Sequence, residues 1–251
     1  MHPILKISGI TMKFGELLAN EDVSFNIEDR EIISLIGPNG AGKTTLFNCI
    51  TGFCAPFSGK IEYDDQHSGC RDITGKSPDL ICRMGITRTF QIVKTLNEMT
   101  VEQNVMTGAF LHTGSTAAAR NESARVLDMT GLSGRKNVMG RNLTIADRKR
   151  VEIARALATK PRILMLDECM AGLNQTEVKD VMKLVIELRD QGLTILIVEH
   201  IMEAIMPISD KIVVLDAGKK IAEGRPKEIA ENGEVIKAYL GEKYHAKNKE
   251  H

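Results

Sequence analysis

Residues 37–44 decide the fold of this chain, and they read Gly37-Pro38-Asn39-Gly40-Ala41-Gly42-Lys43-Thr44. The stretch matches the phosphate-binding pattern G-x-x-x-x-G-K-[ST] at every fixed position. Glycines allow backbone N–H groups to close around a polyphosphate without a clash from a Cβ atom. We expect Lys43 to reach the β- and γ-phosphates of a nucleotide, and the Thr44 hydroxyl to hold Mg²⁺.

Segments on both sides of the stretch support this interpretation over a chance glycine-rich turn. Residues 32–36 are apolar enough to predict a buried strand, and residues 45–50 predict the start of a helix. A helix N-terminus adds partial positive charge where phosphate would bind. Strand, loop and helix together predict a P-loop nucleotide site, in which we include Thr45.

A second apolar run, residues 162–168, ends in two acids. A buried strand that ends in carboxylates places them at the carboxyl edge of a sheet, where ligands bind in open α/β sheets. Asp167 is the candidate for binding Mg²⁺ through water, and Glu168 is the candidate general base that polarises the attacking water. Solvated acids at a strand end are the alternative, which the upstream P-loop makes the weaker one.

A third apolar run, residues 194–200, ends in His200. A histidine at a strand end beside a γ-phosphate would contact it and sense hydrolysis. A lone histidine is more often an ordinary surface or capping residue. Its position downstream of the two acids favours the functional interpretation.

Composition limits the class of protein. The chain has 251 residues, enough for one α/β domain with a sizeable core, and its 33 basic and 33 acidic residues argue against a general nucleic-acid surface. The five cysteines have no C-x-x-C spacing, as expected of reduced thiols in a cytosolic protein. The sequence shows no signal peptide and no apolar run of membrane-spanning length, so we expect any membrane role to depend on a partner.

The remaining segments fit an α/β chain that also has a region of antiparallel strands and a helical region. Residues 4–30 alternate like antiparallel strands, and residues 64–79 are polar and predict loops. Helical patterns dominate residues 96–140, and residues 178–191 predict another helix. The charged residues 242–251 predict a mobile tail.

The chain resembles the ATP-binding cassette (ABC) ATPases over about residues 5–240, and among them the ATPase subunits of branched-chain amino-acid importers. Besides the P-loop, the segments that carry the resemblance are 11–15, 22–25, 48–53, 85–91, 98–101, 171–174 and 198–200. The Arg-Thr-Phe-Gln sequence that ends at Gln91 is typical of the branched-chain subgroup. The resemblance implies a RecA-like P-loop core with an antiparallel β subdomain and a helical subdomain. The cassette would span residues 4–240, with the helical part inserted at about 92–145 and a mobile tail at 241–251.

The resemblance also assigns roles to residues. Phe14 would stack on adenine, where many relatives have tyrosine. Gln91 would act in catalysis and at the metal, and His200 would be the switch histidine. ATP and Mg²⁺ are the implied cofactors.

One motif departs from the family pattern. The signature Leu-Ser-Gly-Gly-Gln, which binds the γ-phosphate of ATP held by a partner subunit, aligns with residues 143–147, Leu-Thr-Ile-Ala-Asp. Thr144 and Ala146 remain candidate nucleotide contacts. Ile145 and Ala146 restrict the backbone relative to glycine, and Asp147 would repel a phosphate. A smaller departure is Cys169, where many relatives have proline.

The resemblance implies an enzyme that hydrolyses ATP to drive import of branched-chain amino acids, or a related small polar solute, through separate permeases. A second cassette would complete the ATP sites, as a homodimer or heterodimer, and a solute-binding protein would act indirectly. The subunit would lie peripherally on the cytoplasmic face of the membrane. The alternatives are another cargo or export, as in lipopolysaccharide-export ATPases, and a non-transport regulatory nucleotide-binding protein.

Overall fold

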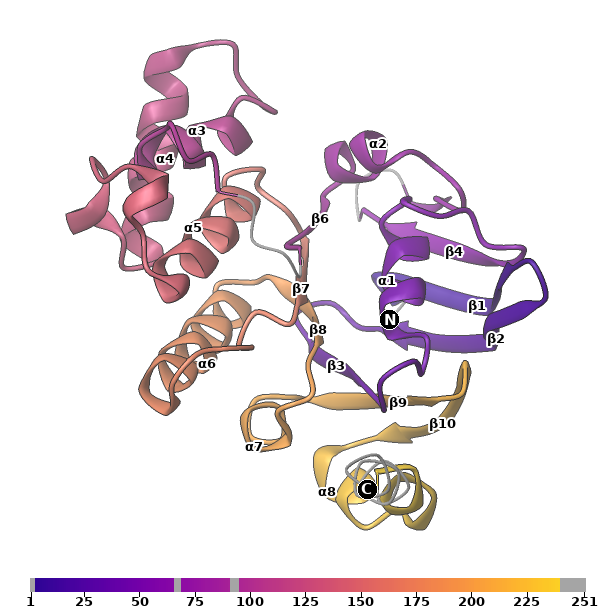
Figure 1. Cartoon of the computed structure of the whole chain (residues 1–251). Coiled ribbons are helices and arrows are strands. Elements are labelled where there is room, and N and C mark those ends of the chain that lie inside the picture. The colour runs from indigo at the N-terminus through magenta and orange to yellow at the C-terminus, as the bar shows by residue number, and fades with distance from the viewer. Residues whose placement is uncertain (1–2, 66–68, 91–94, 240–251) are drawn as a thin grey trace. The chain divides into compact units, whose positions relative to one another are not determined.

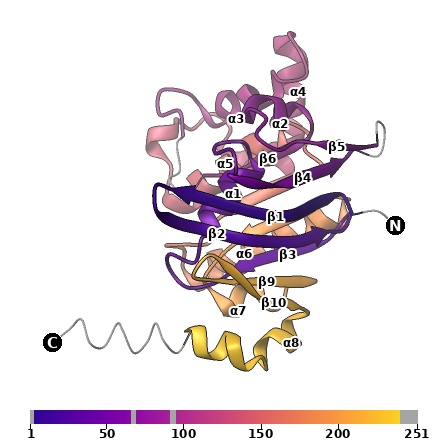
Figure 2. The same cartoon turned by 90° about the vertical axis from the view of Figure 1, so that its right-hand side faces the viewer.

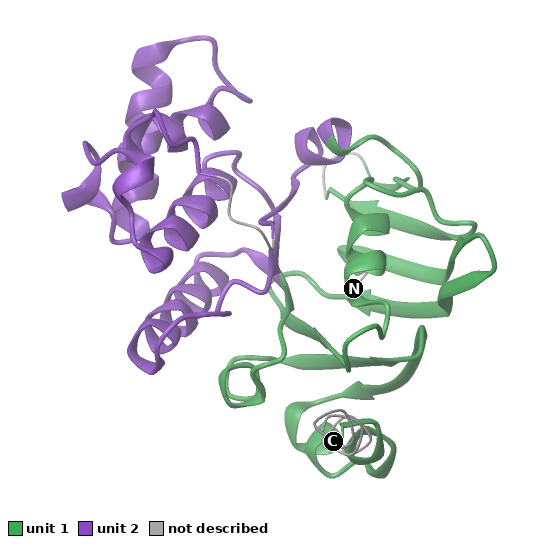
Figure 3. Cartoon of the chain, viewed as in Figure 1, with its two compact units in different colours: residues 1–78, 196–251 green, residues 79–195 purple. Residues whose placement is uncertain are grey.

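A computed structural model describes residues 3–65, 69–90 and 95–239. The chain divides into two compact units, residues 1–78 with 196–251 (unit 1) and residues 79–195 (unit 2), which are distinguished in Figure 3. The mixture of strands and helices predicted from the sequence is present in both. Gln91 and the charged tail lie outside the described residues.

Unit 1 contains an antiparallel sheet whose strand order is β2-β1-β4-β5. Figure 2 shows its first three strands side by side. The alternation of buried and exposed residues along β1 shifts between Ile7 and Ile10, at a bulge that contains Gly9 with a φ of +62°. The strands are β1 (Leu5–Phe14), β2 (Leu17–Ile27), β4 (Ser58–Asp64) and β5 (Cys70–Asp72).

The same unit carries the strand that leads into the phosphate loop. β3 (Ile32–Ile36) is buried at every position and pairs in parallel with β9 (Lys211–Asp216), which pairs antiparallel with β10 (Lys219–Gly224). A core that includes Ile36, Ile212 and Val214 packs between these strands and the C-terminal helices. The helices of unit 1 include α1 (Lys43–Ile50), α7 (Met202–Ile205) and α8 (Pro226–Ala230).

Unit 2 combines two parallel strands with a group of helices. β6 (Ile86–Arg88) pairs in parallel with β7 (Ile163–Asp167). Among the helices, α3 packs against both α4 and α5, and the three lie together in Figure 1. β8 (Thr194–Val198) carries the chain from unit 2 into unit 1. The helices are α2 (Pro78–Arg83), α3 (Val101–Ala109), α4 (Thr116–Met129), α5 (Ile145–Leu157) and α6 (Gln175–Asp190), with short 3₁₀ turns at Ser133–Arg135 and Gly140–Asn142.

The sequence prediction of loops throughout residues 64–79 is wrong in two places. β5 forms within this segment, and α2 begins at its end. β5 has only three residues and all of them are exposed, so it shows no alternation of apolar and polar side chains. The strand forms because it pairs with β4, where Glu62 lies opposite Asp72 and Asp64 lies opposite Cys70.

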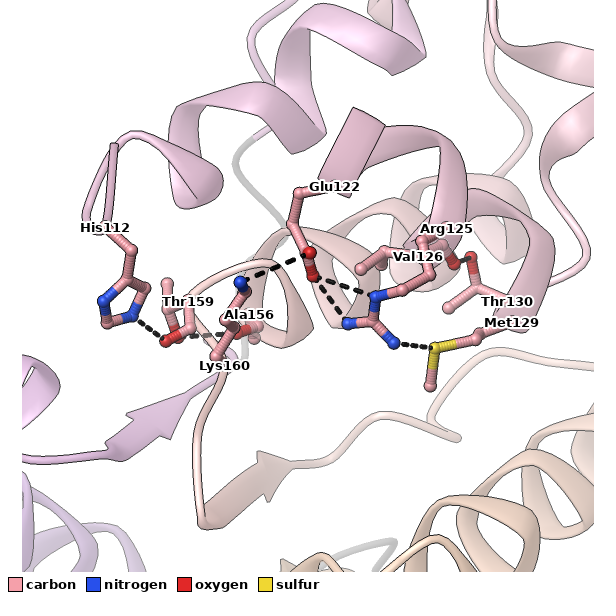
Figure 4. Close-up of polar contacts among 9 residues, drawn as sticks. All are labelled: His112, Glu122, Arg125, Val126, Met129, Thr130, Ala156, Thr159 and Lys160. Carbon is pink, nitrogen blue, oxygen red and sulfur yellow. Dashed lines mark hydrogen bonds and ion pairs between the residues drawn. The ribbon is translucent and has the colours of Figure 1, made fainter. Parts of the chain in front are cut away.

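The turn that leads from α5 to β7 is held by side chains from the turn after α3 and from α4 (Figure 4). The Nε2 atom of His112 lies 2.6 Å from the carbonyl oxygen of Thr159. Lys160 has a φ of +50°, and its ammonium group pairs with Glu122 at 3.6 Å. Glu122 also pairs with Arg125 at 2.6 Å. These contacts fix the point at which the chain leaves α5 and enters the strand that ends in Asp167.

Candidate functional site

The phosphate loop depends on glycine at two positions where another chain segment approaches closely. A Cβ atom on Gly37 would lie 2.0 Å from the carbonyl oxygen of Leu215, and one on Gly42 would lie 2.4 Å from that of Ala19. Both glycines have positive φ values, +149° and +93°. Gly40 also has a positive φ, +81°, but the space around it is open. Sterics therefore fix the ends of the loop, while backbone conformation alone favours glycine in its middle.

Lys43 lies at the start of α1 and is folded back over the loop. Its Nζ donates hydrogen bonds to the carbonyl oxygens of Gly37 at 2.6 Å and Pro38 at 2.8 Å. The ammonium group is thus held among backbone atoms of the phosphate loop, and the residue is only 9% exposed. Thr44 is exposed and Thr45 is half-buried. The predicted P-loop residues, 37–45, therefore lie together in unit 1.

Two contacts from outside the motif support the loop. The side-chain amide of Asn20, on β2, donates to the carbonyl oxygen of Gly42 at 3.2 Å. The backbone N–H of Gly218 donates to the carbonyl oxygen of Ala41 at 3.2 Å. Asn20 is fully buried, and no local pattern in the sequence marks a single polar residue of this kind in a strand.

Two further candidates of unit 1 are exposed. Phe14 is the last residue of β1, and 51% of its surface is accessible, so its ring is available for stacking on a base. His200 follows β8, with 57% of its side chain exposed and its Nδ1 atom 3.8 Å from a carboxylate oxygen of the buried Glu199. The roles of both residues stay predictions, as does that of Gln91, which lies outside the described residues.

The acidic candidates of unit 2 lie at the end of β7. Asp167 is its last residue and is 2% exposed. Glu168 follows with a φ of +47°, in the left-handed region that costs an ordinary side chain roughly 1–3 kcal/mol. Its carbonyl oxygen accepts a hydrogen bond from Nζ of Lys149, on α5, at 2.7 Å. The strained backbone of the candidate base is therefore held by α5, the helix whose first turn contains part of the signature.

Asp167 is held from the neighbouring strand. Its Oδ2 accepts a hydrogen bond from Nη2 of Arg88 at 2.8 Å, in an ion pair whose side chains are 8% and 1% exposed. Its backbone N–H donates to the hydroxyl of Thr89 at 3.1 Å, and Thr89 N–H donates to the carbonyl oxygen of Met165 at 2.9 Å. Burial lowers the pKa of the Arg88 guanidinium, while the adjacent Asp167 carboxylate acts in the opposite direction.

The chain just after β6 is also tied to α5. The Phe90 N–H donates to a carboxylate oxygen of Glu152 at 3.0 Å. Burial raises the pKa of Glu152, and this hydrogen bond acts against the rise. Lys149 and Glu152 surround a gap too narrow for a water molecule, together with Thr89, Phe90, Ile153, Asp167, Glu168 and Cys169. Sequence analysis missed Arg88, Lys149 and Glu152 as parts of this site, although Arg88 stands in the quoted segment 85–91.

The signature segment is regular at its altered positions. Thr144 is the N-cap of α5, and its hydroxyl accepts from the backbone N–H of Asp147 at 3.2 Å. Ile145 and Ala146 occupy the first turn of α5, and neither has a positive φ. The backbone conformation seen here therefore does not require glycine at these two positions.

The charge of Asp147 is balanced locally, which the expectation of phosphate repulsion did not include. Its Oδ2 accepts from the Thr144 hydroxyl at 2.9 Å and pairs with Nη1 of Arg135 at 2.7 Å. The residue is only 7% exposed. The Asp147 carboxylate therefore has a cationic partner in this chain, and its effect on a partner's phosphate stays a prediction.

Among the described residues, no group of three or more histidine, cysteine, aspartate or glutamate side chains could hold a metal ion alone. The oxygen donors named by the motifs, the Thr44 hydroxyl and the Asp167 carboxylate, suit Mg²⁺, which keeps water ligands and binds with substrate phosphates. Each of these two donors is of the kind that suits an ion arriving with a nucleotide.

Comparisons with known proteins agree with these features. The "ABC transporter" family model matches residues 20–171, and the model "Branched-chain amino acid ATP-binding cassette transporter" matches residues 219–245. The high-affinity branched-chain amino acid transport ATP-binding protein LivG of Salmonella typhimurium is 44% identical, over 96% of this chain and 98% of the relative. BraF of Pseudomonas aeruginosa, which has the corresponding name, is 42% identical with the same coverage.

Solved structures show the same fold. The ADP conformation of MJ1267, described as an ATP-binding cassette of an ABC transporter, has a TM-score of 0.86 at 32% identity and covers 96% of this chain and 100% of that one. A nucleotide-free cassette from an ABC transporter has a TM-score of 0.85 at 31% identity, over 95% and 99% of the two chains. The P-loop, the acidic end of β7 and these likenesses confirm the fold and family expected from the sequence, and the chain belongs to the ABC transporter family as an ATP-binding cassette.

Proposed function

We propose that this cassette hydrolyses ATP to drive the import of branched-chain amino acids or a related small polar solute. Relatives named for branched-chain amino acid transport match over nearly their whole length, and the C-terminal family model carries the same description. The observation that carries the ATPase part is the phosphate loop, in which glycines at close approaches and the folded-back Lys43 form a nucleotide cradle.

The residues divide the reaction among them. Lys43 and the loop N–H groups, with Thr45, bind the phosphates, and Phe14 stacks on adenine. Glu168 accepts the proton of the water that attacks the γ-phosphorus, while His200 and Gln91 contact the γ-phosphate and that water. Mg²⁺ held by Thr44, Asp167 and Gln91 would neutralise charge on the phosphates. ADP and phosphate are the products.

The assembly completes the active unit. A second cassette, identical or different, contributes its signature to the ATP bound here, and Thr144 and Ala146 of this chain serve the partner's ATP. No helix of the described residues combines the length and apolarity needed to cross a membrane. We propose separate permeases as the membrane partners, a solute-binding protein that delivers cargo, and a peripheral position on the cytoplasmic face. Within this chain, residues 4–240 form the cassette and about 92–145 its helical insert.

Reconstitution tests the function. The chain, its permeases and a second cassette are placed in proteoliposomes, and ATP-dependent uptake of labelled leucine is measured with the solute-binding protein present. Uptake should require ATP and disappear with Lys43→Ala, whereas Lys60→Ala, which removes an exposed lysine paired with Glu62, should retain it. ATP hydrolysis without uptake of any branched-chain amino acid would reject the cargo, and the absence of phosphate release in every combination would reject the ATPase.

A further inference from the structure

A buried cation faces the carboxylate assigned to the metal. Arg88 and Asp167 are joined by a 2.8 Å hydrogen bond, and both side chains are almost completely withdrawn from solvent. An ion pair at such a place is costly to bury, and removing either partner takes the nearest counter-charge away from the other. Breaking this pair therefore costs more than breaking a surface salt bridge, whose contribution is usually small.

Neighbouring contacts fix the position of the guanidinium. Arg88 is the last residue of β6, which pairs in parallel with β7, so Arg88 lies opposite Met165 and near the end of the strand that carries Asp167. Its Nε donates to the carbonyl oxygen of Thr89 at 3.1 Å, and its guanidinium lies 4.9 Å from the centre of the Phe90 ring. The cation is therefore held in one orientation by the chain that leads to Gln91.

The charge of Arg88 opposes the approach of a second cation to Asp167. We propose that Arg88 is the positioning residue for Asp167: it neutralises and orients this carboxylate in the metal-free cassette and weakens its attraction for free Mg²⁺. The inference rests on the proposed function, which assigns Asp167 to the metal. Mg²⁺ then binds only together with the nucleotide phosphates, whose negative charge outweighs that of the guanidinium.

A purely structural role of Arg88 predicts a different result when this residue is replaced. If Arg88 only tied β6 to β7, its replacement would lower stability equally with and without metal. If Arg88 lowers the affinity for metal, a neutral residue in its place should make the site bind Mg²⁺ more tightly. The dependence of nucleotide binding on Mg²⁺ concentration therefore separates the two roles.

The experiment uses the full-length chain with Glu168→Gln as background, so that ATP is not consumed. ATP affinity is measured by calorimetry across a series of Mg²⁺ concentrations for Arg88→Gln, which keeps a hydrogen-bond donor but loses the charge. The Mg²⁺ concentration for half-maximal enhancement should fall about tenfold, the order expected from removing one unit charge near a divalent ion. Arg88→Lys, which keeps the charge, should retain the value of the background protein.

Controls separate the role of Arg88 from the assignment of Asp167 to the metal. Arg150→Gln removes a guanidinium that pairs with Asp180 at 2.7 Å elsewhere in unit 2, and it should leave the Mg²⁺ dependence unchanged. If Asp167→Asn leaves that dependence unchanged, the metal assignment in the proposed function is wrong. If Asp167→Asn abolishes it while Arg88→Gln matches the background protein, only the role of Arg88 is overturned. Thermal unfolding without metal shows whether each variant is folded before binding is compared.

Discussion

The phosphate loop of unit 1 and the acidic end of β7 in unit 2 are built by different means. The loop is made from backbone atoms, and its Lys43 contacts carbonyl groups only five and six positions away. The end of β7 is made from side chains, and Arg88 and Asp167 lie 79 positions apart in the sequence. The loop depends on close packing around glycines, whereas the strand end depends on buried charges.

This difference predicts how each region fails. A new atom in the loop meets backbone that cannot rotate away, so small additions should be damaging. A lost charge at the strand end leaves its ion-pair partner buried without that counter-charge, so small deletions should be damaging. Variants that add an atom in one region and remove a charge in the other therefore test the comparison.

The largest effect is expected for Glu168→Gln, which removes the candidate base with almost no change in shape. Turnover should fall by roughly 100-fold or more, because general base catalysis contributes about 10²–10⁴-fold. ATP binding should persist, and the ATP-bound dimer should accumulate. Phosphate release and gel filtration with ATP measure the two effects, with the exposed Glu98→Gln as the matched control. Wild-type turnover in the variant would remove Glu168 from the mechanism.

The loop side of the comparison is tested by a pair of alanines. In Gly37→Ala the new Cβ would overlap the carbonyl oxygen of Leu215, so the free energy of unfolding should fall by roughly 3 kcal/mol and ATP affinity should be lost. In Gly40→Ala the space is open, so only the positive φ opposes the change, at about 1 kcal/mol. Denaturant unfolding and ATP titration measure both. Equal losses in the two variants would show that backbone conformation, rather than packing, makes glycine necessary.

The same difference explains what could be predicted from the sequence. The fold, the family and the phosphate loop were predicted because their determinants are contiguous: one strand, one loop and one helix. The ends of β7 and β8 were identified from apolar runs that stop at polar residues. Arg88, Glu152 and Arg135 were missed because their partners are distant in sequence, and periodicity does not show which side chains meet once β6 pairs with β7. The ion pair of Asp147 with Arg135 was missed for the same reason.

The buried carboxylate of Glu152 should have a smaller effect, which is a dependence of the free energy of unfolding on pH. Because burial raises its pKa, the folded protein holds this proton more tightly than the unfolded chain does. The stabilisation that this proton gives is complete below the ordinary glutamate pKa and is lost as the pH rises through the raised value. The stability of the wild type relative to Glu152→Gln should therefore decline over that window and then level off. Urea unfolding across the acidic range, again with Glu98→Gln as control, measures this; a constant difference would contradict it.

The smallest effect on turnover is expected at the signature, because its structure weakens the argument that it binds a phosphate poorly. Restoring glycine at 145 and 146 relieves no positive φ, because both positions are already helical. In the wild type the Thr144 hydroxyl donates to the Asp147 carboxylate. Replacing Asp147 with glutamine removes this acceptor, so the hydroxyl can donate to a phosphate instead. One such hydrogen bond is worth roughly 0.5–1.5 kcal/mol, so the triple variant should hydrolyse ATP as a homodimer about threefold faster.

Arg135 supplies the opposite test of the same site. Arg135→Gln removes the cation that pairs with Asp147 at 2.7 Å, while the Thr144 hydroxyl remains bound to the carboxylate. The uncompensated charge would then face the partner's phosphate in a closed interface, where electrostatic repulsion is stronger than in water. Turnover should fall in this variant and rise in the triple variant, and phosphate release from the chain alone measures both. Parallel changes in the two variants would mean that the ion pair serves only the packing of α5, and that the altered signature is neutral toward ATP.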